Sequence, residues 1–433
     1  MYAKHNGLEK FIQLKQKVIL VTYADDYETT GRWKVTTEHT ETGEQNTHVF
    51  DGVIISTGHH VTPLMVDFPG QEKFKGRIQH THSFKHATGY EGKKVCVIGI
   101  GNSGGDAIVE LAIQAKAVYL STRRGVWIRP RVGHKGFPID NYNSNRIFNW
   151  GMTLLPKGWG DSLFEYYINL RMDHGLYGLK PAHRVFAQHP CINDSLPNAI
   201  LSGRAQVRPN VKEFTENGVI FEGDEEETEV DEVIFATGYK MELPFVDKSI
   251  IAPSTNEVAL YKNMFSADLR HPHTLALVGL VQPLGPIQTT AEMQARWYAA
   301  LAVGKVKLPS KKDMKKVIEK DKEFYRKAFY ESPRHSLEIY YIPYLEEIAS
   351  TLGCMPNLWK IALTDPQLWY HLVFGLYTVY QFRLEGEHRW HGARDAILHT
   401  NDRIEAALKL KYAKDPCFNN HSDMNGITHL AEE

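Results

Sequence analysis

Residues 93–112 read KKVCVIGIGNSGGDAIVELA and join an apolar run, a glycine-rich turn and a helix-like stretch. The run Val95–Ile98 predicts a buried strand, and the pattern Gly99-x-Gly101-x-x-Gly104 follows it directly. In such a turn the first glycine allows a tight bend and the second lets a pyrophosphate approach the backbone. The third lets the helix pack closely on the strand. The order strand, turn, helix therefore predicts a dinucleotide-binding unit and an α/β fold.

The start of the predicted helix supplies groups that would bind the phosphates. Free N–H groups and the helix dipole favour negative charge at a helix N-terminus. Asn102 and Ser103 are expected to add side-chain donors there. The candidate cofactor-binding residues of this turn are Gly99, Gly101, Asn102, Ser103, Gly104, Gly105 and Asp106.

The end of the next predicted strand, Ala117–Leu120, indicates which dinucleotide binds. An acidic residue about 20 positions after the glycines would hold a ribose 2′-hydroxyl. The sequence here is instead Ser121-Thr122-Arg123-Arg124, whose hydroxyls and guanidinium groups can bind a 2′-phosphate. We therefore predict NADP(H) rather than NAD(H). The alternative, a plain surface charge, applies to either arginine singly but not to the whole tetrad.

An internal repeat marks two further strand ends. The pattern Asp-x-Val-Ile-x-x-Thr-Gly occurs at residues 51–58 and again at residues 231–238. Glycine after a strand lets the backbone approach a ligand closely. Thr57, Gly58, Thr237 and Gly238 are therefore candidate cofactor-binding residues. The alternative interpretation is two ordinary strand-to-turn junctions.

Composition limits the functions that remain. The 433 residues favour two domains, and 50 basic against 51 acidic residues leave no basic stripe for nucleic acid. The four cysteines, Cys96, Cys191, Cys354 and Cys417, lack metal-ligand spacing and are expected to be reduced thiols. The 21 histidines are scattered, so no metal site is predicted.

Several motifs together resemble those of the flavin-containing monooxygenases, over essentially the whole chain. Phe74-x-Gly76-x-x-x-His80-x-x-x-Phe84 is similar to the identifying motif of that family. Residues 99–106 resemble its NADPH fingerprint, and residues 235–239 its FATGY segment. Further landmarks are Gly178–Pro181, His189-Pro190, Asn193-Asp194 and Leu196-Pro197. The resemblance is greatest to the vertebrate microsomal enzymes that form dimethylaniline N-oxide.

The resemblance implies a two-dinucleotide-binding-domain flavoprotein fold, with the NADP(H) domain inserted into an FAD domain. We expect an incomplete FAD domain at residues 1–88 and the NADP(H)-binding domain at 89–235. Alternating and β-branched residues separated by turn residues predict a β-meander within residues 17–57, and the apolar run at 53–56 predicts a buried strand. The chain then returns to the FAD domain, with C-terminal helices and a polar, disordered tail, at 236–433. Within this part the sequence predicts an amphipathic helix at residues 310–330, with a capping-box pattern at Ser310 and Asp313. His80 is expected to hold the linker by hydrogen bonds rather than to act as an acid or base.

The resemblance also implies the chemistry. NADPH reduces FAD, the reduced flavin takes up O₂ as a C4a-hydroperoxide, and a small amine or thioether takes the distal oxygen. The cofactor performs such a reaction, while the protein supplies placement and exclusion of water. Val281-Gln282-Pro283 matches a family loop near both cofactors. Gln282 and Asn102 are the candidate polar groups of the catalytic site.

The family carries two glycine fingerprints, and this sequence contains the second one only. From this we expect weak or absent FAD binding by the chain. Two alternatives to a monooxygenase therefore stay open at this point. One is an FAD/NADPH reductase without oxygenation, and the other is a catalytically silent NADP(H)-binding remnant.

The strongest apolar stretch is Leu368–Phe382, which follows the helix-start signal Thr364-Asp365-Pro366. A helix of this length reaches about 22 Å, short of a hydrocarbon core of about 30 Å. The stretch thus predicts either a buried helix or one at a membrane surface. The resemblance favours peripheral contact with the cytosolic face of the endoplasmic reticulum.

Overall fold

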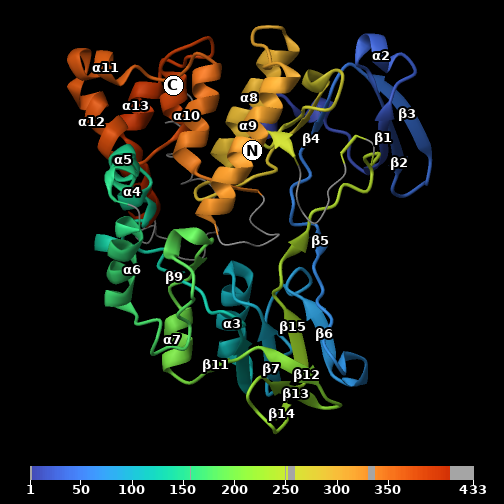
Figure 1. The fold of residues 1–433 in the computed structure, drawn as a ribbon, viewed down its shortest axis with the longest axis vertical. Coiled ribbons are helices and arrows are strands. Elements are labelled where there is room, and N and C mark those ends of the chain that lie inside the picture. Colours follow the sequence, from blue (N-terminus) through green and yellow to red (C-terminus); the bar gives the residue numbers. More distant parts are fainter. Residues whose placement is uncertain (1, 157, 249, 252–258, 330–336, 410–433) are drawn as a thin grey trace.

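A five-stranded parallel sheet organises the nucleotide-binding half of the molecule (Figure 1). The computed structural model describes residues 2–156, 158–248, 250–251, 259–329 and 337–409. The strand order is β11-β8-β7-β15-β6, with β6 (Arg77–His80), β7 (Lys94–Ile98), β8 (Ala117–Ser121), β11 (Ala205–Arg208) and β15 (Glu232–Phe235). Helix α3 (Asn102–Gln114) connects β7 to β8, so the predicted strand–turn–helix–strand unit is confirmed.

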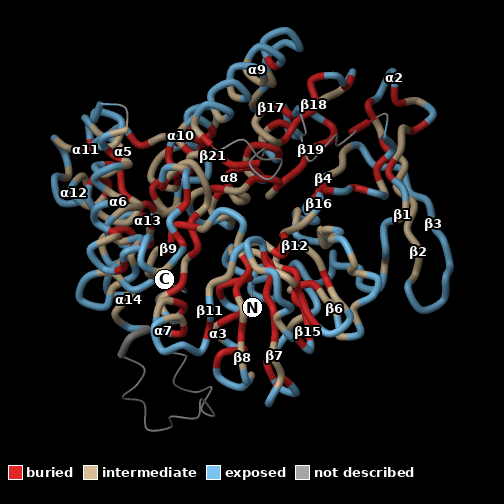
Figure 2. Tube along the Cα trace, turned by 60° about the horizontal axis from the view of Figure 1, so that its bottom comes forward, coloured by how far each residue is buried: buried red, intermediate tan, exposed pale blue. Residues whose placement is uncertain are grey.

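Different elements pack against the two faces of this sheet, and successive side chains of each strand alternate between these faces. Val95, Val97 and Ile234 pack with α3 and with α7 (Leu196–Leu201). Cys96, Ile98, Val233 and Phe235 face the antiparallel sheet of β12 (Val211–Phe214), β13 (Gly218–Phe221) and β14 (Thr228–Glu229). The tube in Figure 2 shows β7 and β15 largely buried between these covers.

The other half contains the predicted meander, β1 (Gln16–Tyr23), β2 (Trp33–His39) and β3 (Gln45–Phe50). Next to it β4 (Val53–Ile55) pairs in parallel with β19 (Leu275–Leu277). We predicted a buried strand at residues 53–56, and this was wrong in part. Ile55 is buried, but Ile54 is 47% exposed, although its ladder partner Ala276 is fully buried, so the core covers this face over β19 and not over β4.

Helices complete this half. A core of buried aromatic and aliphatic side chains joins α8 (Ile287–Ala302) to α10 (Tyr341–Thr351) and to α9 (Lys311–Ala328). The predicted capping box is present, since the Ser310 hydroxyl accepts a hydrogen bond from Asp313 N at 3.2 Å. Short pairs of strands lie nearby: β17 (Leu260–Tyr261) with β18 (Phe265–Ser266), and β20 (Gln282–Pro283) with β21 (Glu338–Ile339).

Two crossings connect the halves, at the antiparallel pair β5 (Thr62–Pro63) and β16 (Tyr239–Lys240) (Figure 1). The sheet already includes β6, which precedes residue 89. The three domain limits given above stay a prediction. His80 ends β6, is buried, and accepts a hydrogen bond from His82 N at its Nδ1.

Residues 125–204 lie between the five-stranded sheet and the C-terminal helices (Figure 1). They contain β9 (Ile128–Arg129), β10 (Cys191–Ile192), α4 (Asp140–Asn143), α5 (Arg146–Leu154) and α6 (Trp159–Arg171). Arg146 is buried, donates to Glu346 Oε1 at 2.8 Å and to the Leu372 carbonyl at 2.8 Å, and lies over the ring of Tyr377. A buried charge of this kind needs such partners, so it fixes α5 onto the C-terminal helices.

The C-terminal helices are α11 (Leu358–Thr364), α12 (Pro366–Phe374), α13 (Ala393–Leu398) and α14 (Thr400–Lys409). The stretch 368–382 is not one helix: α12 ends at Phe374, and Leu368, Leu372, Val373, Tyr377 and Phe382 are buried. Of the two alternatives given for residues 368–382, the structure favours the buried segment, although Tyr370 is 57% exposed and Phe374 is 40% exposed. The predicted polar tail lies outside the described residues. Among those that are described, no helix combines the length and apolar character of a membrane span.

Candidate nucleotide and oxygenation site

The glycine turn between β7 and α3 is shaped by close backbone contacts. Gly99 has a φ of 106°, and a Cβ atom there would lie 2.6 Å from the carbonyl oxygen of Ala236. A Cβ on Gly104 would lie 2.3 Å from the Gly99 carbonyl oxygen. Gly101 differs, because a Cβ there would meet no atom within 4 Å. The turn therefore leaves open space at Gly101, in front of the N-terminus of α3, where a pyrophosphate would bind.

A second segment, residues 191–196, lies against this turn. The Asn102 Oδ1 atom accepts a hydrogen bond from Ile192 N at 2.7 Å, so this oxygen holds the segment rather than a ligand. Asp106 accepts from Asn193 Nδ2 at 3.0 Å, and a Cβ on Gly105 would lie 2.8 Å from the Cys191 sulfur. The sequence predicted that Asn102 and Asp106 lie at the site. It did not predict that their side chains hold residues 191–196 against the turn. The family landmark at 193–194 was the available signal.

The four residues at the end of β8, Ser121 to Arg124, do not act as one group. Ser121 is buried, donates to the Pro209 carbonyl at 3.0 Å and accepts from Val211 N at 3.1 Å. This corrects its predicted contact with a 2′-phosphate, because its hydroxyl is used to join β8 to the start of β12. Thr122 accepts from Gly125 N, and the side chains of Arg123 and Arg124 are exposed at the strand end. Thr122, Arg123 and Arg124 remain the predicted phosphate ligands.

The two Thr-Gly segments meet through the residues that follow them. Gly58 and Gly238 both have positive φ angles, 72° and 86°. The His60 ring stacks on the Tyr239 ring at 4.9 Å, and His80 contacts the same ring edge-on at 5.2 Å. Burial together with neighbouring His60 lowers the pKa of His59 to about 4. Burial also lowers the pKa of His80. These neutral rings form the contact where the chain crosses between the halves.

Gln282 lies on β20, beyond the carboxyl end of β19. In the parallel β20–β21 ladder Gln282 is paired with Glu338. The Glu338 side chain is 1% exposed, and its Oε2 atom lies 3.5 Å from His189 Nδ1. Nothing in the sequence pattern singled out Glu338, because residues far apart in the chain create its environment.

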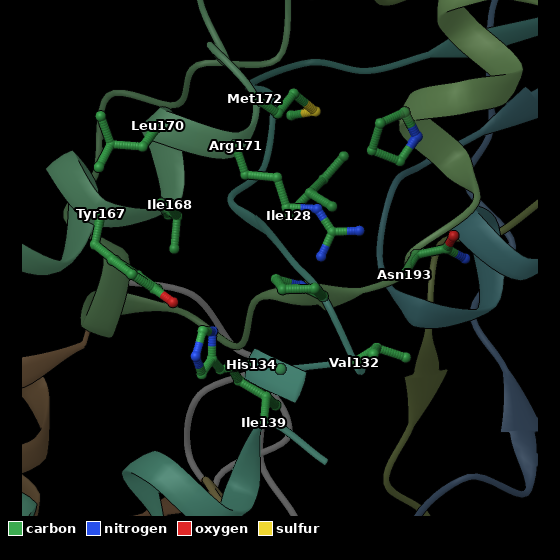
Figure 3. Close-up of a pocket in the computed structure, with 13 residues that line it drawn as sticks. Ile128, Val132, His134, Ile139, Tyr167, Ile168, Leu170, Arg171, Met172 and Asn193 are labelled. Carbon is green, nitrogen blue, oxygen red and sulfur yellow. The ribbon is translucent and has the colours of Figure 1, made fainter. Parts of the chain in front are cut away.

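A cavity of about 370 Å³ adjoins the segment that braces α3 (Figure 3). Ile128, Ile139, Ile168 and Met172 give it mainly apolar walls. Figure 3 shows the Arg171 guanidinium directed toward the side of the cavity where Asn193 lies. Asn193, which lines this cavity, also donates to Asp106 on α3, so one side chain joins the cavity to the helix. Within the described residues, no group of His, Cys, Asp and Glu side chains has metal-binding geometry.

Comparison with known proteins identifies the family. The flavin-binding monooxygenase-like family matches residues 1–428. The chain belongs to this family. It is 47% identical to rat flavin-containing monooxygenase 5 over 410 residues, which cover 94% of this chain and 76% of the relative. It is 39% identical to dimethylaniline monooxygenase [N-oxide-forming] 2 of Pan troglodytes over 417 residues, 96% of this chain and 77% of the relative.

A solved structure shares the fold. The S-allyl-L-cysteine S-oxygenase of Allium sativum superposes with a TM-score of 0.56 at 18% identity, over 96% of this chain and 74% of that one. The two-dinucleotide-binding flavoprotein fold is therefore confirmed. Membership in the family makes this an NADPH- and FAD-dependent monooxygenase rather than a silent remnant, and its cofactors are FAD and NADP(H).

The described residues fit both cofactors, to different extents. For NADP(H), the open space at Gly101 and the free N-terminus of α3 match a pyrophosphate. For FAD, the carboxyl ends of β4 and β19 lead into Gly58 and Gly279, both with positive φ. A Cβ on Gly58 would meet no atom within 4 Å. The prediction of weak FAD binding is not tested by the structure.

Proposed function

We propose that this monooxygenase oxygenates small molecules at a soft nitrogen or sulfur atom. The observation that carries the proposal is the built nucleotide site, a glycine turn with open space at Gly101 at the start of α3. The substrate class follows from the relatives, one named for N-oxide formation and another for S-oxygenation. When bound, NADPH supplies a hydride and FAD supplies the ring that activates O₂.

The proposed roles of the residues follow from their positions. Backbone N–H groups at the start of α3 bind the pyrophosphate, and Thr122, Arg123 and Arg124 bind the 2′-phosphate. Asn102 fixes the bracing segment 191–196, and Gln282 presents its carboxamide at the flavin half. Thr57-Gly58 and Thr237-Gly238 let the two strand ends approach the cofactors. No side chain is required to act as a nucleophile or metal ligand.

The test is product formation in the presence of NADPH, FAD and ¹⁸O₂. We expect a thioether or tertiary amine to yield an oxide that contains one ¹⁸O atom, with NADPH consumed in proportion. NADPH oxidation that continues without any oxide would favour the reductase alternative. Flavin absorbance of the purified chain, measured beforehand, separates loss of FAD from loss of oxygenation.

The nucleotide preference has its own test. Replacing both Arg123 and Arg124 with Ala should weaken NADPH binding about a hundredfold or more, since each removes a charge-assisted contact of roughly 1.5–3 kcal/mol. NADH binding should be nearly unchanged. Ser121→Ala is the matched comparison, because it should lower stability without altering the preference. A preference for NADPH that survives the double replacement would refute the assignment.

We propose peripheral membrane contact at the cytosolic face of the endoplasmic reticulum through α6 and α11. Both helices lie along one edge of the molecule (Figures 1 and 2). The exposed fractions of Trp159, Leu163 and Leu170 on α6 range from 64% to 68%, and Trp359 and Leu363 on α11 are each 87% exposed. Apolar side chains grouped on one edge fit a lipid interface.

Flotation with phosphatidylcholine vesicles containing phosphatidylserine tests this contact. Leu163→Glu combined with Leu363→Glu should abolish co-flotation. Val49→Glu on β3, at the opposite edge, introduces the same charge on a half-exposed residue and should leave it unchanged. Equal flotation of all variants would contradict the proposed surface.

A further inference from the structure

A buried carboxylate, Glu338, lies where the two halves of the molecule meet. Its side chain is 1% exposed, and within the described part of the chain neither carboxylate oxygen has a hydrogen-bond partner. His189 Nδ1 lies 3.5 Å from Glu338 Oε2, and this contact is an ion pair when the imidazole is protonated. Burial of an unpaired carboxylate costs several kcal/mol, so Glu338 needs a partner, and the His189 ring is the basic group that the described residues place beside it.

The two members of the pair come from different parts of the fold. Glu338 belongs to β21, and its ladder partner is Gln282 on β20. Residues in register on neighbouring strands project to the same face of a ladder, so the carboxylate and the Gln282 carboxamide share one face. Leu284 N also donates to the Ile339 carbonyl at 3.2 Å, which extends the connection beyond Gln282. Displacement of Glu338 would therefore move Gln282.

His189 is connected to the nucleotide-binding turn through the four residues that follow it in the chain. Two residues after it, Cys191 N donates to the Trp127 carbonyl and the Cys191 sulfur lies against Gly105. Ile192 N then donates to Asn102, and Asn193 donates to Asp106. The segment 189–193 thus contacts the first turn of α3 at one end and Glu338 at the other.

We propose that His189 and Glu338 form a positioning pair that sets Gln282 relative to the nucleotide-binding turn. Neither residue contacts the reacting atoms. The pair transmits the position of the α3 N-terminus, through residues 189–193, to the β20–β21 ladder. A buried ion pair adds little net stability, and in some proteins it specifies one arrangement of the elements that it joins, which is the role we assign to this pair. The inference rests on the nucleotide site proposed above.

The test compares Glu338→Gln, His189→Gln and the double variant by calorimetric titration with NADP⁺. Each single variant should weaken NADP⁺ binding at least about fivefold, the lower end of ordinary coupling between sites. The double variant should be no weaker than either single one, because one interaction is lost in all three. His189→Lys places a permanent cation at this position and should retain most of the affinity that His189→Gln loses.

Hydrogen exchange supplies a readout that a merely structural residue would not change. In the wild-type chain NADP⁺ should slow exchange in peptides covering residues 278–285, and in Glu338→Gln this protection should be lost. Glu292→Gln on α8 removes a carboxylate that pairs with Arg383 at 2.7 Å and should leave affinity and protection intact.

The outcomes are distinguishable. Wild-type affinity and retained protection in Glu338→Gln would overturn the inference, even if its melting temperature falls. If Glu338→Gln does not fold, His189→Gln alone decides, since its side chain is 29% exposed and tolerates replacement more readily. Failure of the wild-type chain to bind NADP⁺ would refute both the nucleotide site and the positioning pair.

Discussion

The two copies of the strand–Thr–Gly repeat have nearly the same sequence and different surroundings. β15 lies inside the five-stranded sheet between β7 and β6, and all four of its residues are buried. β4 pairs with β19, and of its three residues Ile55 is buried while Ile54 is 47% exposed. The comparison shows that an apolar pattern specifies a strand. The neighbouring strands, and the elements that pack on them, decide whether that strand is buried.

The largest expected difference is between equivalent isoleucines. Ile234→Ala removes a fully buried side chain and should lower the free energy of unfolding by about 2–5 kcal/mol. Ile54→Ala removes a half-exposed one and should cost about 0.5 kcal/mol or less. Urea unfolding of both variants measures the difference. Equal losses would mean that the face around Ile54 is covered in solution.

The glycine turns after β7 and β4 provide the second comparison. Gly99→Ala combines a φ of 106° with a Cβ only 2.6 Å from the Ala236 carbonyl oxygen. It should cost at least about 2 kcal/mol and abolish NADP⁺ binding. In Gly58→Ala the backbone is strained but the new Cβ has open space, so the free energy of unfolding should fall by only about 1 kcal/mol. Thermal denaturation with and without NADP⁺ measures both; NADP⁺ stabilisation retained in Gly99→Ala would contradict the site.

The repeat threonines should differ less. Thr237 is buried and its hydroxyl donates to the Leu64 carbonyl, whereas Thr57 is exposed. Thr237→Val should lower the free energy of unfolding by about 1 kcal/mol, the usual contribution of one hydrogen bond. Thr57→Val should have almost no effect. The denaturation midpoints of the two variants measure this difference. A larger loss of stability in Thr57→Val than in Thr237→Val would contradict the prediction.

The last expected effect is on acid stability. Since the pKa of His59 in the folded chain is about 4, against about 6.5 when unfolded, the unfolded chain binds the proton more readily between these values. The stability contributed by neutral His59 is therefore complete above about pH 6.5 and is lost as the pH falls toward about 4. His59→Gln should flatten this part of the stability curve, measured by urea midpoints across that window. His48→Gln on β3 is the control, and an unchanged slope in His59→Gln would show that other groups dominate.

Local sequence was sufficient for elements whose cause is local. The order of apolar run, glycine turn and helix predicted β7 and α3, and the Ser310–Asp313 capping box predicted the start of α9. The same reasoning failed for 368–382, where apolar character fits burial and a membrane surface equally well. The packing of α12 against the C-terminal helices settled that ambiguity.

The sequence by itself determined the nucleotide-binding turn, because the need for glycine at Gly99 and Gly104 arises from backbone geometry within a few residues. It also carried the motifs that identify the family. Only the tertiary structure decided that Ser121 is buried beneath β12, that Asn102 braces residues 191–196, and that Glu338 faces His189. The reason is physical. Burial, and with it the partner that a polar side chain needs, depends on segments distant in the chain that meet after folding.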